Sequence, residues 1–198
     1  MSILTINDLT IAHVGPIKLE VKPGEVVCLS GASGSGKSMM LRAMADIIPA
    51  RGSVSLGEIK STSISAPMWR QQVALLPAES QWWLDTVGEH FNAPDLKLFQ
   101  RLGFDKDCLD WQISRCSTGE KQRLALLRVL ANKPKCLLLD EPTGSLDPEN
   151  TLKVEALLSS LASAQQLPML WVSHSHEQIK RVADRHFVMR DGKLVDYE

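Results

Sequence analysis

The sequence predicts an α/β fold, a mostly parallel sheet with helices on both faces, together with an N-terminal antiparallel β subdomain and a small helical insertion. Three observations lead to this class. Short apolar segments alternate with helical patterns, residues 3–25 alternate apolar and polar side chains, and residues 78–116 carry no strong strand pattern. Strands that alternate with helices favour a parallel sheet covered on both faces.

The first part of the chain predicts antiparallel strands followed by a strand, a loop and a helix. Residues 3–25 show the alternation that is typical of half-buried strands. The apolar run 26–29 predicts a buried strand, and after a loop rich in glycine and serine a helical pattern over 39–48 stops near Pro49. A second β-rich piece extends to about residue 65.

The middle of the chain predicts one more buried strand over 73–77 and then a helical subdomain over about 78–116. Aromatic side chains are spread among the polar residues of this subdomain. We therefore expect a mostly helical insertion packed around them. The aromatic residues are Trp82, Trp83, Phe91, Phe99, Phe104 and Trp111.

The final part of the chain returns to alternating helices and strands. Apolar runs predict strands over 136–140 and 169–173, with a helix over about 149–164 between them. A hairpin is expected around 191–192. Because the chain shows no internal repeat and no low-complexity linker, we expect a single domain over 1–198.

Composition excludes several classes of protein. Hydrophobic residues make up 44% of the 198 residues, charged residues 23%, and the net charge is -1, so we expect no nucleic-acid partner. The chain has no apolar run of the roughly 20 residues that span a bilayer and no leader pattern, so we expect it to stay in the cytoplasm. Four cysteines lack metal-site spacing and are expected to be reduced packing residues. They are Cys28, Cys108, Cys116 and Cys136.

The strongest chemical pattern is the segment 31–38, which fits G-x-x-x-x-G-K-[ST] between a predicted strand and a predicted helix. Backbone N–H groups of such a loop turn inward around phosphate oxygens, and the helix N-terminus adds positive potential. Lys37 would reach the β and γ phosphates, and Ser38 would offer its hydroxyl to magnesium. A flexible turn is the less favoured alternative. The phosphate loop comprises Gly31, Ala32, Ser33, Gly34, Ser35, Gly36, Lys37 and Ser38.

Two adjacent acids end the predicted strand 136–140. Ligands of a parallel sheet bind at the carboxyl ends of its strands, where Asp140 and Glu141 would lie. Asp140 would hold magnesium through a water molecule, and Glu141 would polarise the attacking water as general base. A solvated acidic turn is the alternative, but the phosphate loop upstream favours a functional pair.

With three further motifs, the chain resembles the ABC ATPase family over nearly its whole length. The resemblance implies a P-loop NTPase fold and an ATPase that uses ATP and Mg²⁺. It also implies that the chain energises transport by a separate membrane-spanning subunit, at the inner face of the cell membrane. The motifs are Ser117-Thr118-Gly119-Glu120-Lys121-Gln122-Arg123, Gly144-Ser145-Leu146-Asp147 and Trp171-Val172-Ser173-His174.

The resemblance assigns roles to these motifs. The signature residues Ser117, Thr118, Gly119 and Glu120 would bind the γ-phosphate of ATP held by a second copy in a head-to-tail dimer. Ser117 and Glu120 also form a capping box in the sequence, which a helix start would explain equally well. His174 would contact the γ-phosphate and the attacking water. The D-loop, Ser145, Leu146 and Asp147, would lie along the dimer seam, although a turn and helix start at Asp147 would explain its residue types.

The sequence also departs from the family pattern. Ala78 stands where a magnesium-contacting glutamine is usual, and Glu79 or Gln81 could replace it after a loop shift. Thr118 replaces a glycine, and Cys116 and Glu120 replace a leucine and a glutamine. We therefore expect slower or differently gated hydrolysis. His13 is the candidate for stacking on adenine.

Partner and substrate predictions depend on other residues. Trp82 and Trp83 predict either a docking groove for the membrane subunit or core packing of the insertion. Residues 69–73 and 85–87 make the chain most similar to small bacterial exporter ATPases of the iron-export type. The alternatives are a soluble or envelope-signalling ABC ATPase that does not transport, and a protein that binds nucleotide without hydrolysis. Intact Glu141 and His174 argue against the latter.

Overall fold

The N-terminal strands form a four-stranded antiparallel sheet in the order β2-β1-β4-β5. The computed structural model describes residues 2–197. Leu4 and Ile6 of β1 are both buried, with an exposed or half-buried residue between and after them, as the alternation of the sequence predicts. The antiparallel subdomain is thus confirmed. Its strands are β1 (Leu4–Ile11), β2 (Val14–Val21), β4 (Arg51–Leu56) and β5 (Ile59–Lys60).

The second sheet has six strands in the order β10-β9-β3-β8-β7-β6. All neighbours pair in parallel except the terminal hairpin of β9 and β10. The apolar runs of the sequence form the central strands because these strands are buried on both faces. The strands are β3 (Val26–Ser30), β6 (Val73–Leu76), β7 (Cys136–Asp140), β8 (Met169–Val172), β9 (Arg185–Arg190) and β10 (Lys193–Asp196).

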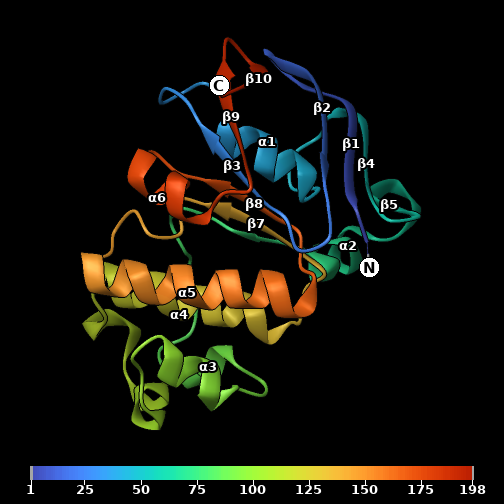
Figure 1. Ribbon diagram of the computed structural model, residues 1–198. Helices are drawn as coiled ribbons and strands as arrows, with labels where there is room; N and C mark the ends of the chain where they lie inside the picture. The colour runs from blue at the N-terminus through green and yellow to red at the C-terminus, as the bar shows by residue number, and fades with distance from the viewer. Residues whose placement is uncertain (1, 198) are drawn as a thin grey trace.

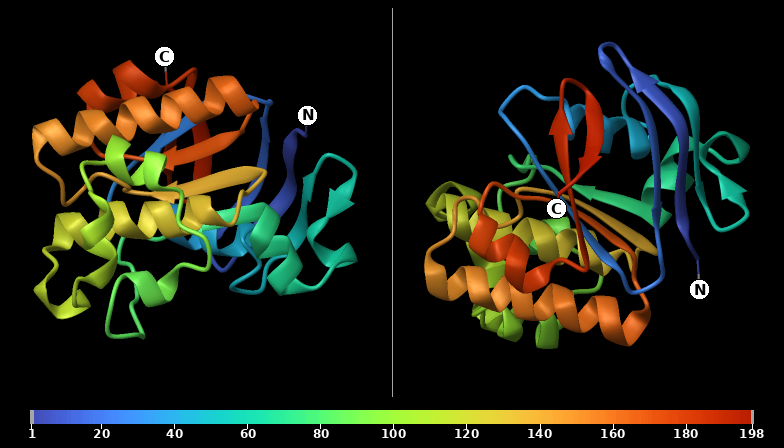
Figure 2. Two further views of the ribbon diagram at one scale, coloured as in Figure 1. Left: turned by 90° about the horizontal axis from the view of Figure 1, so that it is seen from below. Right: turned by 45° about the horizontal axis from the view of Figure 1, so that its top comes forward.

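Helices cover both faces of the six-stranded sheet, as expected. Figure 1 shows α4 and α5 on one side of it and α1, with the antiparallel sheet, on the other; Figure 2 shows the same layers from two further directions. Within β3, Val26 and Cys28 join the core formed with α4 and α5, whereas Val27 and Leu29 join the core formed with α1. The helices are α1 (Lys37–Met44), α2 (Ala66–Gln72), α4 (Thr118–Ala131), α5 (Pro148–Gln165) and α6 (His176–Val182).

The expected helical insertion contains one short α-helix, α3 (Leu96–Arg101), and three single 3₁₀ turns. Its aromatic residues pack as expected in part. The rings of Phe91 and Phe99 are both buried and meet edge to face at 5.1 Å, but Trp83 is 68% exposed. The 3₁₀ turns are Gly88–His90, Lys106–Asp110 and Ile113–Arg115.

One helix end differs from the sequence prediction, and one helix was not predicted. α1 ends at Met44 rather than near Pro49, because the chain turns at Asp46, whose φ of 54° is left-handed. The segment of α2 directly follows the second β-rich piece and was not predicted as a helix. None of the helices in residues 2–197 combines the length and apolar character that a bilayer crossing requires.

The four cysteines are buried packing residues, as predicted. Burial, assisted by the negative charge of Asp184, raises the pKa of the Cys28 thiol to about 12. Thiols in such surroundings stay protonated and unreactive at neutral pH.

Candidate functional site

The phosphate loop leaves β3 and enters α1 at the carboxyl edge of the parallel sheet. Two glycines allow its path. Gly31 has a φ of 137°, and a Cβ there would lie 2.4 Å from the carbonyl oxygen of Met189. Gly36 precedes α1 with a φ of 107°, and its Cβ would lie 2.2 Å from Cγ2 of Val14. Only glycine fits both positions without displacing a neighbour.

The side chain of Lys37 folds back into the phosphate loop. Its Nζ donates hydrogen bonds to the carbonyl oxygens of Gly31 at 2.8 Å and Ala32 at 2.9 Å. Burial lowers the pKa of Lys37, and the negative charges of Glu141 and Asp140 oppose that shift. The ammonium is therefore held at the loop by neutral carbonyl oxygens. Phosphate oxygens can replace these acceptors, and their hydrogen bonds to the ammonium would be stronger because they are charge-assisted.

Asp140 ends β7 beneath the loop and is 4% exposed. Burial raises the pKa of its carboxyl, while a hydrogen bond from Ser38 opposes the shift. Its Oδ1 is buried and has no hydrogen-bond partner within the described residues. A buried carboxylate oxygen next to a serine hydroxyl is a set of hard oxygen donors of the kind that Mg²⁺ prefers, so these residues fit the ion.

Glu141 and His174 meet at the edge of the sheet. The strands that carry them, β7 and β8, are parallel neighbours, so both side chains follow strand ends at the same edge. Nε2 of His174 lies 3.0 Å from Oε1 of Glu141, and both side chains are roughly half exposed. Glu141 has a left-handed φ of 49°, a strained conformation that is often retained where a side chain must be aimed.

Two hollows flank the phosphate loop. One, of about 620 Å³, contains His13, residues 31–35 and the turn between β9 and β10. The other, of about 490 Å³, brings the phosphate loop together with Glu141 and His174. Its lining residues are Ser33, Gly34, Gly36, Lys37, Ser38, Met39, Arg42, Ile48, Glu141 and His174. Part of the predicted phosphate loop, the metal candidate Ser38 and the two catalytic candidates therefore share this hollow, with Asp140 buried against Ser38. The rest of the loop lines the neighbouring hollow with His13.

Residues 14–144 match the protein family described as "ABC transporter", so the match covers most of the chain and includes the phosphate loop and acid pair. The chain belongs to this family. It is an ATP-binding subunit of an ABC transporter, an ATPase that energises transport.

Two curated relatives align with nearly the whole chain. The "Aliphatic sulfonates import ATP-binding protein SsuB 3" of Nocardia farcinica is 36% identical over 183 residues, 91% of this chain and 72% of the relative. "Protein STAR1" of Oryza sativa subsp. japonica is 35% identical over 193 residues, 91% of this chain and 56% of the relative. This chain therefore spans between about half and three quarters of their lengths.

A solved structure confirms the ABC fold. The dimeric post-hydrolysis structure of the ATP-binding cassette MJ0796, bound to ADP and Pi, has a TM-score of 0.85 and 22% sequence identity to this chain. The likeness covers 98% of this chain and 97% of that one. At this identity it shows the fold, which agrees with the predicted mostly parallel sheet and antiparallel subdomain.

The signature of this ABC chain starts α4 with the capping box that the sequence predicts. Ser117 N donates to Oε2 of Glu120 at 2.8 Å, and Glu120 N donates to Oγ of Ser117 at 3.2 Å. Thr118 is exposed at the first position of the helix. None of Ser117, Thr118, Gly119 and Glu120 lines either hollow beside the phosphate loop.

The D-loop lies beside the signature and also starts α5. A Cβ on Gly119 would lie 3.2 Å from the carbonyl oxygen of Ser145 and 3.3 Å from Cδ2 of Leu146. Asp147 caps α5, because its Oδ1 accepts from Asn150 N at 2.9 Å. The turn and helix start considered for Asp147 is thus present, and a role at a dimer seam remains a prediction.

Two buried glutamines have contacts that the sequence did not predict. Gln122, 4% exposed, donates from Nε2 to the carbonyl oxygen of Pro77 at 3.3 Å and accepts at Oε1 from Ser80 Oγ at 3.0 Å. It therefore fastens the segment that contains the exposed Ala78. Gln178 occupies a similar buried position in α6. A polar residue within the buried stripe of a helix was the available indication in both cases.

The two tryptophans of the insertion differ in environment. Arg128 stacks on both, 4.4 Å from the ring centroid of Trp82 and 4.8 Å from that of Trp83. The ring of His90 meets each edge-on, at 4.8 and 4.9 Å. Trp82 packs partly buried against the core, whereas Trp83 is largely exposed. Core packing thus accounts for Trp82, and docking remains a prediction for Trp83.

Proposed function

We propose that this subunit binds Mg-ATP across the phosphate loop and hydrolyses it with Glu141 and His174, as one half of a head-to-tail dimer docked on a membrane-spanning subunit. The observation that carries the proposal is the 3.0 Å contact between these two side chains in the cavity of the phosphate loop. A base and an orienting group beside a phosphate cradle are the parts that phosphoryl transfer to water requires.

Each group has a distinct task in this proposal. Lys37 exchanges the carbonyls of Gly31 and Ala32 for phosphate oxygens. Ser38 and Asp140 would hold Mg²⁺, which neutralises charge on the phosphates when bound. Glu141 takes a proton from the water as its oxygen bonds to the γ-phosphorus and the bond to the β–γ bridging oxygen breaks. In the tautomer that carries a hydrogen on Nε2, His174 donates to Glu141 and keeps the carboxylate turned toward the cavity.

The signature supports a dimer as the hydrolysing unit. Its helix start is capped and exposed, and it lies outside the hollows of its own phosphate loop. A second copy in head-to-tail arrangement would bring that positive helix end to the γ-phosphate. The cassette MJ0796 has been solved as a dimer, which favours the same arrangement here.

The relatives favour an importer over the iron-export type suggested by residues 69–73 and 85–87. Several bacterial relatives at 33–36% identity are named for the import of aliphatic sulfonates. Trp69 is fully buried and its Nε1 donates to the carbonyl oxygen of Met44 at 2.8 Å. Packing therefore accounts for Trp69 in the first of these segments without reference to a substrate. We propose that substrate choice lies with the membrane subunit.

Copurification tests the proposal. Tagged Glu141→Gln protein is purified from detergent-solubilised cells with Mg-ATP, and Lys37→Ala protein serves as the control. We expect a multi-span membrane protein to be retained in equal amount with Glu141→Gln and a nucleotide-dependent dimer that Lys37→Ala does not form. A soluble homodimer alone, with normal ATP binding, would favour the soluble ABC ATPase instead.

A further inference from the structure

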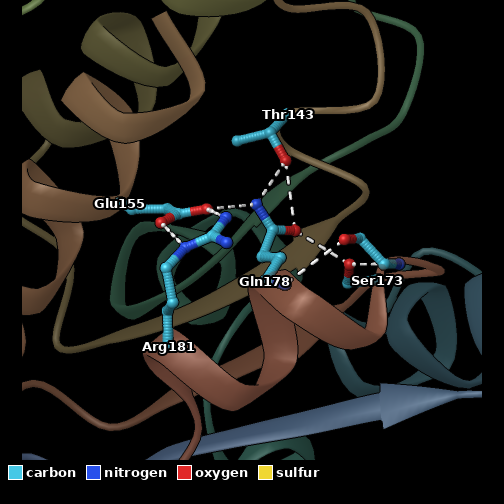
Figure 3. Close-up of polar contacts among 6 residues, drawn as sticks. Thr143, Glu155, Ser173, Gln178 and Arg181 are labelled. Carbon is cyan, nitrogen blue, oxygen red and sulfur yellow. Dashed lines mark hydrogen bonds and ion pairs between the residues drawn. The ribbon is translucent and has the colours of Figure 1, made fainter. Parts of the chain in front are cut away.

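Figure 3 shows a buried hydrogen-bond network around Gln178. Several of its residues line a hollow together with Glu141 and His174. The centre of the network is Gln178 of α6, which is 3% exposed. Nε2 of Gln178 donates to Oγ1 of Thr143 and to Oε1 of Glu155, both at 2.9 Å. Its Oε1 accepts from Oγ of Ser173 at 2.8 Å. One amide therefore joins groups from three separate segments of the chain.

The ion pair beside Gln178 decides which way its amide points. Arg181 donates to both carboxylate oxygens of Glu155, from Nε at 2.8 Å and Nη2 at 2.7 Å. Burial raises the pKa of Glu155, but hydrogen bonds from Arg181 and Gln178 outweigh it and lower the pKa overall. An ionised carboxylate only accepts hydrogen bonds, so the nitrogen of Gln178 must face Glu155 and its oxygen must face Ser173.

The two hydroxyls that Gln178 holds belong to the loops that carry the proposed catalytic side chains. Thr143 lies in the turn after Glu141, which is closed by a bond from Gly144 N to the carbonyl oxygen of Glu141 at 3.1 Å. Ser173 directly precedes His174 at the end of β8. Beyond the two strand ends, Gln178 is thus a side-chain bridge between the two loops.

We propose that Gln178 is a positioning residue for hydrolysis, which ties the turn after Glu141 to the loop before His174 and so sets the contact between those two side chains. The Glu155–Arg181 pair orients Gln178. The proposal rests on the roles proposed above for Glu141 and His174. Both of these side chains are roughly half exposed, so the backbone beneath them has to supply the precision that packing does not. Misplacement by about 1 Å is enough to cost about 100-fold in rate.

Substitutions of similar size test this role in the full chain. Gln178→Met removes the side-chain hydrogen bonds to Thr143, Glu155 and Ser173 but keeps the volume, and Gln178→Glu places a carboxylate against Glu155. For either variant we expect a fall in kcat of about 10- to 100-fold with little change in the KM for ATP. The double variant Gln178→Glu with Glu155→Gln relieves the repulsion between the two carboxylates but turns an amide nitrogen toward the guanidinium of Arg181, because Oε1 of Glu155 accepts from both Gln178 and Arg181. We expect it to recover only part of the turnover lost in Gln178→Glu.

A control separates positioning from general stability. Ile179 is the neighbouring apolar residue of α6 and is 4% exposed, so Ile179→Ala should lower the melting temperature and leave kcat per folded molecule unchanged. If Gln178→Met lowered only the melting temperature and left kcat per folded molecule unchanged, the positioning role would be overturned.

Glu141→Gln in the same assay distinguishes the two levels of the proposal. An inactive Glu141→Gln together with a fully active Gln178→Met would overturn only the role of Gln178. A Glu141→Gln protein as active as the unaltered chain would overturn the proposed function, and the role of Gln178 with it.

Discussion

The ammonium nitrogen of Lys37 lies 2.8 Å from the carbonyl oxygen of Gly31, at the other end of the same phosphate loop. The ammonium group thus donates to a backbone carbonyl in place of the phosphate oxygens that a bound nucleotide would offer. We expect Lys37→Ala to weaken ATP binding by about 10- to 100-fold, the size of one lost charge-assisted contact. Titration with a fluorescent ATP analogue measures the dissociation constant of both proteins. Unchanged affinity would contradict the assignment of the phosphate loop.

Close packing of Gly36 against Val14 predicts a steric effect on the same loop. In Gly36→Ala, the left-handed φ and the approach to Cγ2 of Val14 should together destabilise the fold by about 2–4 kcal/mol, measured by urea unfolding. Gly34→Ala is the matched control, because that position has a φ of 78° but nothing within 4 Å of its Cβ. Adding Val14→Ala to Gly36→Ala should restore part of the stability; no restoration would place the strain elsewhere.

We expect the ionised carboxyl of Asp140 to lower the stability of the fold while it supports Mg-dependent turnover, and the stability cost to depend on pH. Because burial raises its folded-state pKa, the folded chain binds a proton more readily than the unfolded chain, and stability falls as pH rises through that raised pKa. Asp140→Asn removes the free-energy cost of burying an ionised carboxylate. We expect a higher melting temperature at pH 7, by about 2–4 °C for each kcal/mol gained, and loss of Mg-dependent turnover.

The advantage of Asp140→Asn should shrink as the pH is lowered, because the native carboxyl becomes protonated. Differential scanning calorimetry between pH 4 and 8 measures this in the absence of nucleotide. An advantage that stayed constant over this range would show that ionisation of Asp140 is not the cause.

Ser117 has a structural and a proposed functional role that substitution can separate. Ser117→Ala removes the capping box and should destabilise the chain by about 1 kcal/mol. Ser117→Asp keeps an acceptor for Glu120 N, so stability should be retained, but its charge would repel the γ-phosphate of a partner's ATP. We expect turnover to fall in both variants and the melting temperature only in Ser117→Ala. Normal turnover in Ser117→Asp would count against the signature role.

The difference in exposure between Trp82 and Trp83 predicts opposite phenotypes. Trp83→Ala should weaken retention of the membrane subunit in copurification and leave the melting temperature within about 1–2 °C of the unaltered chain. Trp82→Ala should lower the melting temperature, because Trp82 packs against the core and carries the stacked guanidinium of Arg128. Undiminished retention in Trp83→Ala would remove the docking role.

Local sequence patterns predicted an element correctly where only one structure explains the residue types in the pattern. The apolar runs became the central strands because only a strand buried on both faces is apolar at every position. The capping box formed as Ser117 and Glu120 predict. Boundaries were less certain, since the early end of α1 depends on the left-handed turn at Asp46.

The amino-acid sequence by itself determined the phosphate loop, the acid pair and the fold class, because each depends on residues close together in the chain. Only the tertiary structure decided that Gln178 joins Thr143 to Ser173, that Gln122 holds the loop of Ala78, and that Trp82 and Trp83 differ in exposure. Their bonds link segments far apart in sequence. A glutamine or a tryptophan carries no local pattern that indicates which distant group it will meet.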